Sequence, residues 1–436
     1  MKYDYDIIVI GGGSGGLVVA SGASSLGARV ALIEESDMGG DCLNTGCVPS
    51  KSFLKVGHTC EAIRNSEKYG VKSEIKEVDI NKVMERVNSV IETIRPKDSK
   101  ERYEKMGVDV LKGRGIIEDS NSVKVGDKIL KTKNIVIATG SSPFIPDIKG
   151  LDSISYFTNE NIFKIDKKPK HLIVLGGGPI GLELGQGFSE IGSKVTIIDR
   201  NKNMFSKDEP EVGNLMIDVF KNMNISVKLN SKILEIEKDN EDIKVFIEID
   251  GKKEVVVGDS ILVSLGRNPN TKNIGAEKIG LKLDKRGSII TDLQMKTNIK
   301  NIYACGDVTG PYQFTHMASY QASIVIKNII SPIKSKADYS YVPWTTYTKP
   351  EVSHVGMMEK AAKEKRVFGK SITIPLDEAD KSVAEGDING FLKLILGKRG
   401  SVLGATIVGE KAGELITIAS IAIKNKMKVN DFANII

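Results

Sequence analysis

Cys42 and Cys47 are the residues of this sequence whose type and spacing most clearly suggest chemistry. They belong to the segment Gly39–Lys51, in a chain that has only four cysteines. A regular helix holds residues i and i+5 about 8–9 Å apart at Cα, whereas a disulfide tolerates at most about 7 Å. If the two cysteines pair, the segment must be distorted, with Cys42 in a loop and Cys47 at a helix start. Because a helix N-terminus lowers the pKa of a thiol and favours the thiolate, we interpret the pair as a redox dithiol/disulfide that faces a cofactor, rather than as two unrelated buried thiols.

An internal repeat in the first half of the chain predicts two elements of one kind. Residues 11–34 match residues 176–199 at a constant offset of 165, and each copy ends in an acid, Glu34 or Asp199. Each copy follows a short β-branched run and opens with a glycine cluster, which is the pattern of a strand–helix–strand unit that binds a dinucleotide. The glycines permit the tight turn, the approach of the pyrophosphate and close helix packing, and the helix N-terminus stabilises the diphosphate. Two copies in register therefore predict two dinucleotide sites.

The spelling Gly-Gly-Asp-Cys-Leu-Asn-Thr-Gly-Cys-Val-Pro-Ser-Lys over residues 39–51 resembles the redox-active centre of the flavin-dependent pyridine nucleotide-disulfide oxidoreductases. Dihydrolipoamide dehydrogenase, glutathione reductase and mercuric reductase are members of that family, and the resemblance covers essentially the whole chain. It implies an enzyme with FAD at the first fingerprint, a nicotinamide cofactor at the second, and a redox disulfide between Cys42 and Cys47. It also implies that Cys47 lies nearer the flavin ring and that Cys42 is the interchange thiol that meets an external substrate.

The resemblance assigns the flavin contacts to further landmarks. The run Ile135–Gly140 resembles a crossover out of the flavin domain, and Gly113-Arg114-Gly115 resembles a place where relatives run backbone past the adenine. In relatives the aspartate that closes the motif Asn301–Asp307 binds the ribityl chain, and the segment Gln313–His316 should lie along the isoalloxazine. The residues expected to bind FAD are Gly11, Gly13, Ser14, Gly15, Gly16, Glu34, Lys51, Gly115, Thr139, Gly140, Ser141, Asp307, Gln313, Phe314, Thr315 and His316.

The second fingerprint and a return crossover at Gly266 are expected to bind the nicotinamide cofactor. Asp199 favours a free 2′-hydroxyl, and hence NADH, because a 2′-phosphate would face a carboxylate. The neighbouring Arg200 is the residue that would accommodate that phosphate, so NADPH is the alternative. The residues expected at this site are Gly176, Gly178, Ile180, Gly181, Glu183, Asp199, Arg200, Ile233 and Gly266.

Lys51 and Glu183 are expected to act together. Lys51 follows Cys47 by four residues, and Glu183 lies in the first turns of the second fingerprint helix. In relatives a lysine and a glutamate at these positions pair beside flavin N5, where a cation would stabilise the anionic reduced flavin and orient the thiolate. We therefore expect Cys42, Cys47, Lys51 and Glu183 to carry the chemistry. The alternative is that the last two are separate surface charges.

Other cysteines and histidines are expected to be ordinary. Cys60 and Cys305 are interpreted as core residues, and His58, His171 and His354 as surface or helix residues.

Composition excludes several classes of protein. The net charge of +6 comes from 62 basic and 56 acidic residues that are interspersed, without the basic blocks of a nucleic-acid-binding protein. Four cysteines are too few for a secreted disulfide scaffold and suit a reducing compartment. Seven glycines interrupt the apolar residues 7–33, so neither a signal peptide nor a membrane span is expected. We expect a cytoplasmic protein without a metal site, a membrane partner or a nucleic-acid partner.

The chain is too long for one core, and its motifs predict an α/β fold. Two Rossmann-like dinucleotide-binding domains, of the FAD and NAD(P) type, are expected to precede a C-terminal α+β interface domain. The expected bounds are 1–149 for the first part of the FAD domain, 150–275 for the NAD(P) domain, 276–340 for the second flavin-side part, and 341–436 for the interface domain.

Hydrophobic patterns predict individual elements. Apolar residues recur at helical spacing from Ile80 to Ile94, so a helix should stop before Pro96. The last domain should contain strands over Tyr341–Tyr347, Val367–Ile374, Phe391–Leu396 and Val402–Val408, followed by a helix over Leu415–Asn425.

By resemblance, the interface domain builds a homodimer, and a His-Pro motif from the partner's C-terminal tail completes the active site with a general base. The resemblance runs through Asp431-Phe432-Ala433-Asn434, and no His-Pro dipeptide occurs among the 436 residues. Either the tail lies outside this sequence or the substrate half-reaction is handled differently.

The substrate is expected to be a small-molecule or lipoyl-domain dithiol or disulfide. Asp199 and the Cys-Leu-Asn-Thr-Gly-Cys spelling favour a dihydrolipoamide dehydrogenase. Gly-Gly-Asp-Cys and the run Pro311–His316 also resemble relatives grouped with mercuric reductase, although no cysteine follows Cys305 to supply the extra pair expected of that enzyme. Glutathione reductase is a third possibility. An alternative of another class is a non-catalytic flavin-binding subunit with a structural disulfide.

Overall fold

The computed structural model describes residues 2–435 and divides them into two compact α/β units. The first unit comprises residues 2–50, 85–144 and 266–338, and the second comprises residues 51–84, 145–265 and 339–435. Each unit contains one of the two glycine fingerprints at the end of a parallel strand. The expected α/β fold class is confirmed, while the four domain boundaries stay a prediction.

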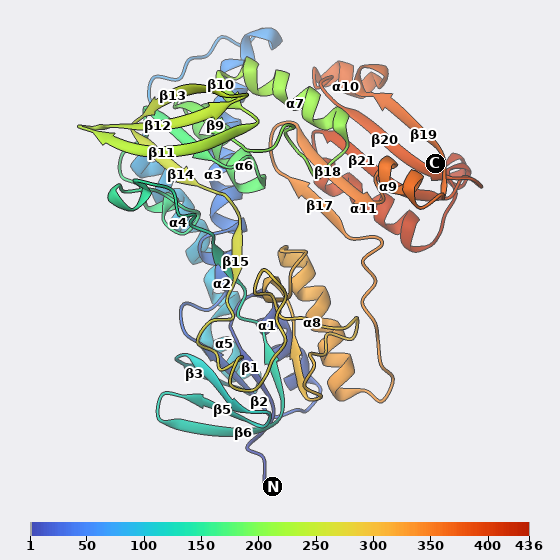
Figure 1. Ribbon diagram of the computed structural model, residues 1–436. Coiled ribbons are helices and arrows are strands. Elements are labelled where there is room, and N and C mark those ends of the chain that lie inside the picture. The colour runs from blue at the N-terminus through green and yellow to red at the C-terminus, as the bar shows by residue number, and fades with distance from the viewer. Residues whose placement is uncertain (1, 436) are drawn as a thin grey trace. The chain divides into compact units, whose positions relative to one another are not determined.

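A seven-stranded sheet forms the centre of the first unit (Figure 1). Its strands run in the order β3-β2-β1-β6-β5-β4, and β16 pairs with β6 beside that path. Strands β1, β2, β3, β6 and β16 pair in parallel, whereas β4 and β5 extend the sheet as an antiparallel meander. The bounds are β1 Tyr5–Ile10, β2 Val30–Glu34, β3 Val108–Lys112, β4 Gly115–Asp119, β5 Ser122–Val125, β6 Lys128–Ile137 and β16 Ile302–Ala304, with a separate ribbon of β7 Ser141–Pro143 and β15 Arg267–Pro269. The helices are α1 Ser14–Ser25, α2 Gly40–Asn44, α5 Lys100–Lys105 and α8 Thr315–Ile330, and α4 Ile80–Ile94 belongs partly to this unit.

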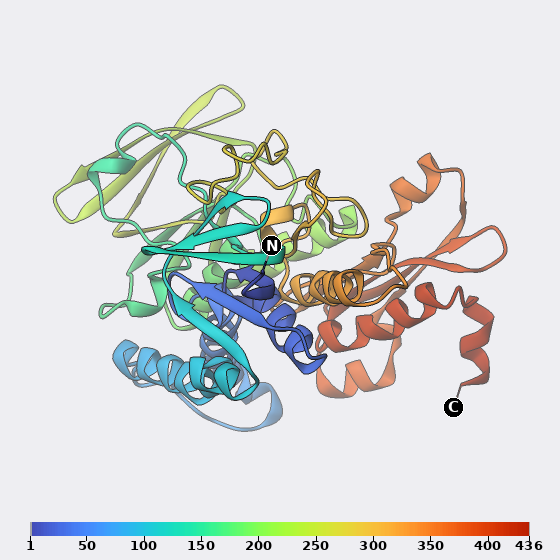
Figure 2. The ribbon, with the colours of Figure 1, turned by 90° about the horizontal axis from the view of Figure 1, so that it is seen from below.

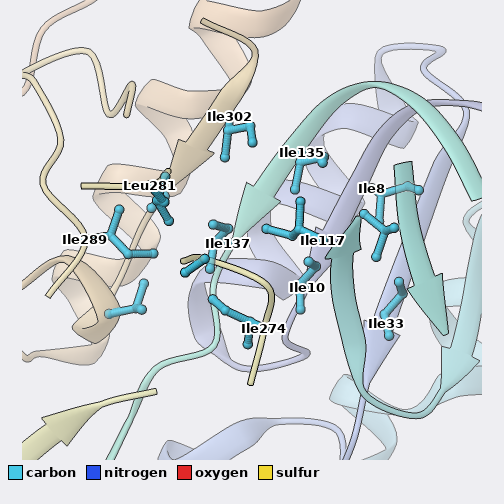
Figure 3. Close-up of a cluster of buried hydrophobic side chains, with 14 of the residues drawn as sticks. Ile8, Ile10, Ile33, Ile117, Ile135, Ile137, Ile274, Leu281, Ile289 and Ile302 are labelled. Carbon is cyan, nitrogen blue, oxygen red and sulfur yellow. The ribbon is translucent and has the colours of Figure 1, made fainter. Parts of the chain in front are cut away.

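The core of this unit is rich in isoleucine because its central strands consist largely of β-branched residues (Figure 3). Ile8 and Ile10 of β1 and Ile135 and Ile137 of β6 point to one face, since alternate residues of a strand share a face. The opposite face of β1 is covered by α1, which packs beside α8 (Figure 2). The sheet therefore fixes where the first fingerprint helix begins.

The second unit contains three sheets. A parallel sheet of order β10-β9-β8-β14 carries the second fingerprint, an antiparallel sheet of order β11-β12-β13 follows it in the chain, and an antiparallel sheet of order β17-β18-β21-β20-β19 belongs to the C-terminal region. The strand bounds are β8 His171–Leu175, β9 Lys194–Ile198, β10 Ile225–Lys228, β11 Ser231–Asp239, β12 Asp242–Ile249, β13 Lys252–Gly258, β14 Ser260–Val263, β17 Pro343–Thr346, β18 Glu351–Gly356, β19 Phe368–Pro375, β20 Phe391–Gly397 and β21 Val402–Gly409. The helices are α3 Cys47–Arg64, α6 Pro179–Glu190, α7 Pro210–Asn222, α9 Glu359–Glu364, α10 Asp380–Glu385 and α11 Ala412–Lys424; residues 47–50 of α3 belong to the first unit.

Helices α3 and α6 of this unit pack along one another. Lys51 of α3 pairs with Glu183 of α6, with 2.7 Å between Nζ and Oε2. Seven residues further along both helices, His58 Nε2 lies 3.9 Å from Glu190 Oε2. The close approach of the two helices requires glycine at position 187, because a Cβ there would lie 2.8 Å from a ring carbon of Phe53 in α3. An ion pair therefore joins the two helices at one end, and His58 and Glu190 lie close together at the other.

A buried lysine joins α7 to the C-terminal sheet. Lys393 of β20 is 3% exposed, and its Nζ lies 3.0 Å from Glu209, 2.7 Å from Glu211 and 3.0 Å from Glu359. Glu209 is itself 3% exposed. One cation therefore neutralises carboxylates from separate segments of the second unit.

The helices and strands that hydrophobic patterns predicted are mostly confirmed. The helix over residues 80–94 has the expected bounds, and β17, β19, β20, β21 and α11 overlap the predicted segments. The strand β18, however, was not expected, and it contains His354, which is fully buried. The expectation for His354 as a surface or helix residue was therefore wrong, as it was for His171, which lies in β8.

Candidate active site

The cysteine segment folds back onto the first fingerprint. Gly39 and Gly40 have φ angles of 95° and 59°, in the left-handed region that favours glycine. The Gly39 N–H donates to the carbonyl oxygen of Gly12 at 2.9 Å, and a Cβ on Gly40 would lie 2.6 Å from Cα of Gly13. These glycines therefore let the backbone before the cysteines pass directly over the predicted dinucleotide turn.

Cys42 lies in the short helix α2 and Cys47 is the first residue of α3. The expected helix start at Cys47 is confirmed, whereas the expected loop around Cys42 was wrong. Thr45 supports the break between the helices, because its Oγ1 donates to Asp41 Oδ1 at 2.7 Å. Because α2 ends at Asn44 and α3 begins at Cys47, no single regular helix contains both cysteines. The Cα separation of residues i and i+5 in a helix therefore does not prevent them from approaching one another.

The two sulfur atoms lie within reach of one another. Cys42 is half-buried and Cys47 is exposed. A hydrogen bond with Cys47, reinforced by burial, raises the pKa of the Cys42 thiol well above its usual range. Cys47 Sγ also lies 3.3 Å from Thr315 Oγ1, at the start of α8. Cys47 therefore lies beside Thr315, one of the residues predicted to follow the isoalloxazine, and Cys42 contacts both Cys47 and Thr315.

The first fingerprint has the geometry that a diphosphate requires. Gly13 is the N-cap of α1 and gives it no side-chain cap, so the first N–H groups of the helix can face an anion. A Cβ on Gly16 would lie 1.8 Å from the carbonyl oxygen of Gly11, which shows why strand and helix need glycine here. The Glu34 carboxylate ends β2 and accepts from the N–H groups of Gly12 and Ser36. These features fit the FAD expected at this turn.

A polar network surrounds Asp307 after β16. Ser141 Oγ donates to Asp307 Oδ2 at 2.7 Å and accepts from Arg267 Nε at 2.7 Å. Arg267 Nη2 also lies 3.3 Å from Asp41 Oδ2. Burial raises the pKa of Asp307. The network thus ties the predicted ribityl-binding aspartate to the residue that precedes Cys42.

Arg267 and Asp41 were not predicted as site residues. Arg267 appeared in the sequence only as part of a crossover motif, and 226 positions separate it from Asp41. Its side chain is 11% exposed, and an arginine so buried is expected to have acidic partners. That rule is a signal for a partner, but it does not say which acid is near.

The remaining predicted flavin residues also lie in the first unit, except Lys51. Gly115 begins β4, and Thr139 and Gly140 follow β6. Gln313 and Phe314 immediately precede α8, while Thr315 and His316 begin it. The rings of Phe314 and His316 stack at 5.4 Å.

The second fingerprint repeats the geometry of the first. Gly178 is the N-cap of α6 without a side-chain cap, and a Cβ on Gly181 would lie 2.1 Å from the carbonyl oxygen of Gly176. The Asp199 carboxylate accepts from the N–H groups of Gly177 and Asn201. These contacts match those of Glu34 at the same offset of 165 positions, and they fit a second dinucleotide.

Other predicted nicotinamide residues are distributed around this fingerprint. Ile180 lies in α6, Arg200 is exposed just after Asp199, and Ile233 lies in β11. Gly266 belongs to the first unit and precedes β15.

Lys51 and Glu183 form an ion pair rather than separate surface charges. Glu183 is 5% exposed, and its Oε1 accepts from the N–H of Tyr347 at 2.9 Å while its Oε2 binds Lys51. The Nζ of Lys51 lies 4.4 Å from the centroid of the Tyr347 ring. The expected pairing is thus present, and Tyr347 is a neighbour that the sequence did not reveal.

The other cysteines lie in the core as expected. Cys60 is 7% exposed in α3, and Cys305 is fully buried after β16. Burial raises the pKa of Cys305 to about 12. Across residues 2–435, no helix combines the length and the apolar character that crossing a bilayer would require.

Comparisons with known proteins agree with this geometry. Residues 5–322 match the family described as pyridine nucleotide-disulphide oxidoreductase, and residues 342–436 match its dimerisation domain. Mercuric reductase of Staphylococcus aureus is 31% identical over 432 residues, which are 99% of this chain and 79% of that protein. Dihydrolipoyl dehydrogenase of Bacillus subtilis is 34% identical in an alignment of 441 positions that covers 98% of this chain and 92% of that protein.

A solved structure extends the comparison to the fold. The HOCl-induced flavoprotein disulfide reductase RclA from Escherichia coli superposes with a TM-score of 0.88 at 26% identity, covering 99% of this chain and 96% of the other. The matched family consists of oxidoreductases that use FAD and NAD(P)H. The matched range 5–322 includes both fingerprints and the cysteine segment described above. The chain therefore belongs to the pyridine nucleotide-disulphide oxidoreductase family.

Proposed function

We propose that this chain transfers electrons between NAD(H) and a dithiol/disulfide substrate through Cys42 and Cys47, and that its substrate is dihydrolipoamide. The observation that carries the proposal is the contact between the two cysteines at the start of α3, with Cys47 beside Thr315. Bound FAD would supply the relay of an electron pair between the nicotinamide and the two sulfurs.

The cysteines have distinct roles in this proposal. In the oxidised enzyme, a thiolate of the substrate attacks Cys42, and the bond between Cys42 and Cys47 breaks with Cys47 leaving as thiolate. The second substrate thiol then attacks the substrate sulfur of the mixed disulfide, so that the bond to Cys42 breaks, Cys42 leaves as a thiol, and a cyclic disulfide product is released. The start of α3 stabilises the negative charge on Cys47, because the N-terminus of a helix carries a partial positive charge.

Asp199 supports NADH as the nicotinamide cofactor. Its carboxylate lies at the end of β9, where it is fixed by two backbone N–H groups. A 2′-phosphate at this position would face that negative charge. The exposed Arg200 is the residue that NADPH would require instead.

Reduction of mercuric ion is a second candidate. Mercuric reductase of Bacillus cereus is 33% identical over 431 residues, which are 99% of this chain and 68% of that protein. The identity is close to that of the dihydrolipoyl dehydrogenases, so overall similarity does not separate the two activities. A substrate panel does separate them.

The test uses purified FAD-loaded enzyme with NADH and NADPH in parallel. Lipoamide, glutathione disulfide, Hg²⁺ and Cu²⁺ are compared as electron acceptors, and dihydrolipoamide with NAD⁺ tests the reverse direction. We expect lipoamide turnover with NADH, and a loss of at least about 1000-fold in Cys42→Ser and in Cys47→Ser. Cys60→Ala is the matched control, because Cys60 is a buried residue to which the proposal gives no role, so the substitution should leave turnover intact. Strong NADPH oxidation that depends on Hg²⁺, without lipoamide turnover, would replace dihydrolipoamide by mercuric ion.

Alkylation separates an enzyme from a flavin-binding subunit with a structural disulfide. Reduction by NADH should make Cys42 and Cys47 reactive toward iodoacetamide. Flavin bleaching by NADH that leaves both cysteines unmodified would support the structural alternative.

We further propose a homodimer in the cytoplasm. The dimerisation domain supports the homodimer, and Leu415, Ile418 and Ile421 present an exposed apolar stripe along α11. The low number of cysteines suits a reducing compartment. Light scattering after size exclusion would show twice the chain mass, and a monomeric mass at micromolar concentration would contradict the homodimer.

A further inference from the structure

Side chains of α6 form hydrogen bonds with the backbone of the segment between β17 and β18. Tyr347 N–H donates to Glu183 Oε1 at 2.9 Å, and Lys349 N–H donates to Gln186 Oε1 at 2.7 Å. Gln186 Nε2 donates in return to the Lys349 carbonyl oxygen at 2.8 Å. Gln186 is fully buried. A side-chain amide therefore pairs with this backbone as a neighbouring strand would.

This attachment determines where the Tyr347 ring lies. The ring centroid is 4.4 Å from Nζ of Lys51, a distance at which an aromatic face attracts a cation. The same Nζ is 2.7 Å from Glu183 Oε2. Lys51 is thus restrained by a carboxylate and by a ring, and both are held by the same face of α6.

Lys51 needs this restraint because its side chain is long and partly exposed. The side chain is 38% exposed, and a lysine with four rotatable bonds loses considerable rotamer freedom when it is held in one position. An ion pair alone constrains distance more than direction, since a carboxylate accepts over a wide range of angles. A ring on a second side removes part of the remaining freedom.

We infer that Tyr347 is a positioning residue for Lys51, and that Gln186 acts through the 347–349 backbone to keep the ring in place. The inference rests on the proposed function and on the expectation, implied by the family resemblance, that the Lys51 ammonium stabilises the reduced flavin. Tyr347 does not touch the reacting atoms in this arrangement. Its effect passes through the direction in which the ammonium points, one helical turn after Cys47 in α3.

The test compares two substitutions of Tyr347 in the FAD-loaded protein. Tyr347→Leu removes the ring but keeps the backbone N–H that binds Glu183, whereas Tyr347→Phe keeps both. Tyr341→Leu is the matched control, because it removes a tyrosine ring from another lysine, Lys424, at 5.5 Å. Tyr347→Met supplies a second ring-free variant with an unbranched side chain if the leucine variant does not fold.

Two measurements read the position of Lys51 directly. Acylation of Lys51 by acetic anhydride, followed by mass spectrometry, should be at least about fivefold faster in Tyr347→Leu than in the wild type. The midpoint potential of the bound flavin should become more negative, because the cation is held less well near the reduced ring. A tenfold change in the flavin reduction equilibrium corresponds to about 30 mV.

The outcomes distinguish the inference from the proposed function. Faster acylation and a lower potential in the ring-free variant, with wild-type values in Tyr347→Phe and Tyr341→Leu, support the positioning role. Wild-type values of both quantities in the ring-free variant overturn it, even if the enzyme reduces lipoamide. If no acceptor in the panel is reduced but acylation of Lys51 still accelerates, the positioning role stands and the proposed function fails.

Discussion

Replacing Glu190 by glutamine tests how the second polar pair of α3 and α6 is charged. Glu190 is 1% exposed, and neither of its carboxyl oxygens has a hydrogen-bond partner within residues 2–435. Burial, reinforced by repulsion from Glu61, raises the pKa of Glu190 from 4.5 to about 8. Burial also lowers the pKa of the neighbouring His58 from 6.5 to about 4. Both groups are therefore neutral in the folded protein near pH 6.

The two groups contribute to stability with opposite signs. Between pH 4.5 and about 8, the folded protein keeps a proton on Glu190 that the unfolded chain has lost, so the free energy of unfolding falls as pH rises. One pH unit corresponds to about 1.36 kcal/mol, so the full window amounts to about 5 kcal/mol. The contribution of His58 rises between pH 4 and 6.5, because there the unfolded chain holds the extra proton.

Glu190→Gln removes the first contribution and leaves the second. The free energy of unfolding of the variant should match that of the wild type near pH 4.5. At pH 8 it should exceed that of the wild type by a few kcal/mol. The assay is guanidinium unfolding between pH 5 and 9, followed by fluorescence of Trp344, which is the sole tryptophan and lies in the same unit. Comparing the two proteins at each pH cancels the contributions of all other groups.

Glu241→Gln is the control, because Glu241 is solvent-exposed in the turn between β11 and β12. It should leave the pH profile unchanged. A difference between Glu190→Gln and the wild type that stays constant from pH 5 to pH 9 would refute the reasoning.

Three substitutions elsewhere have expected outcomes. Asp199→Ser should raise the kcat/KM ratio of NADPH to NADH by about tenfold, since it removes the carboxylate that would face a 2′-phosphate; initial rates measure the ratio, and an unchanged value would contradict the role of this acid. Gly16→Ala should prevent retention of FAD, because the added Cβ would lie 1.8 Å from the Gly11 carbonyl oxygen; a normal ratio of flavin to protein absorbance would speak against this. Lys393→Met should lower the free energy of unfolding by about 3–5 kcal/mol, because the buried Glu209 would lose its cation; tryptophan fluorescence during denaturation measures the change, and a wild-type midpoint would contradict this role of Lys393.

The parts of the site that local sequence determines could be predicted. Gly11 and Gly16 have roles that follow from sterics within one turn, and Glu34 ends a strand that is recognisable as a continuous buried apolar run. The same holds at Asp199. The roles of such residues can be predicted from sequence because their partners lie within about twenty positions along the chain.

The parts that depend on distant segments could not be predicted from pattern. His354 looked like a polar surface residue, yet its Nδ1 lies 2.7 Å from Thr406 Oγ1 and its ring lies 4.5 Å from that of Trp344. Tyr347 lies beside Lys51 in a segment whose backbone is bound by Glu183 and Gln186 of α6. In each case burial of a polar group is made possible by a partner in another element, and apolar periodicity contains no record of that partner.

Because α3 and α6 contact one another at matching positions, insertions and deletions within these helices should be tolerated less well than substitutions. One inserted residue turns everything beyond it by about 100° around a helix axis. An insertion between Lys51 and His58 would therefore rotate one of them away from its glutamate. It would also move Gly57 away from Glu190, where only glycine fits because an added Cβ would lie 2.3 Å from Glu190 Oε2. Relatives of this protein should accordingly show gaps in the turn between β11 and β12 but none within residues 51–58 or 183–190.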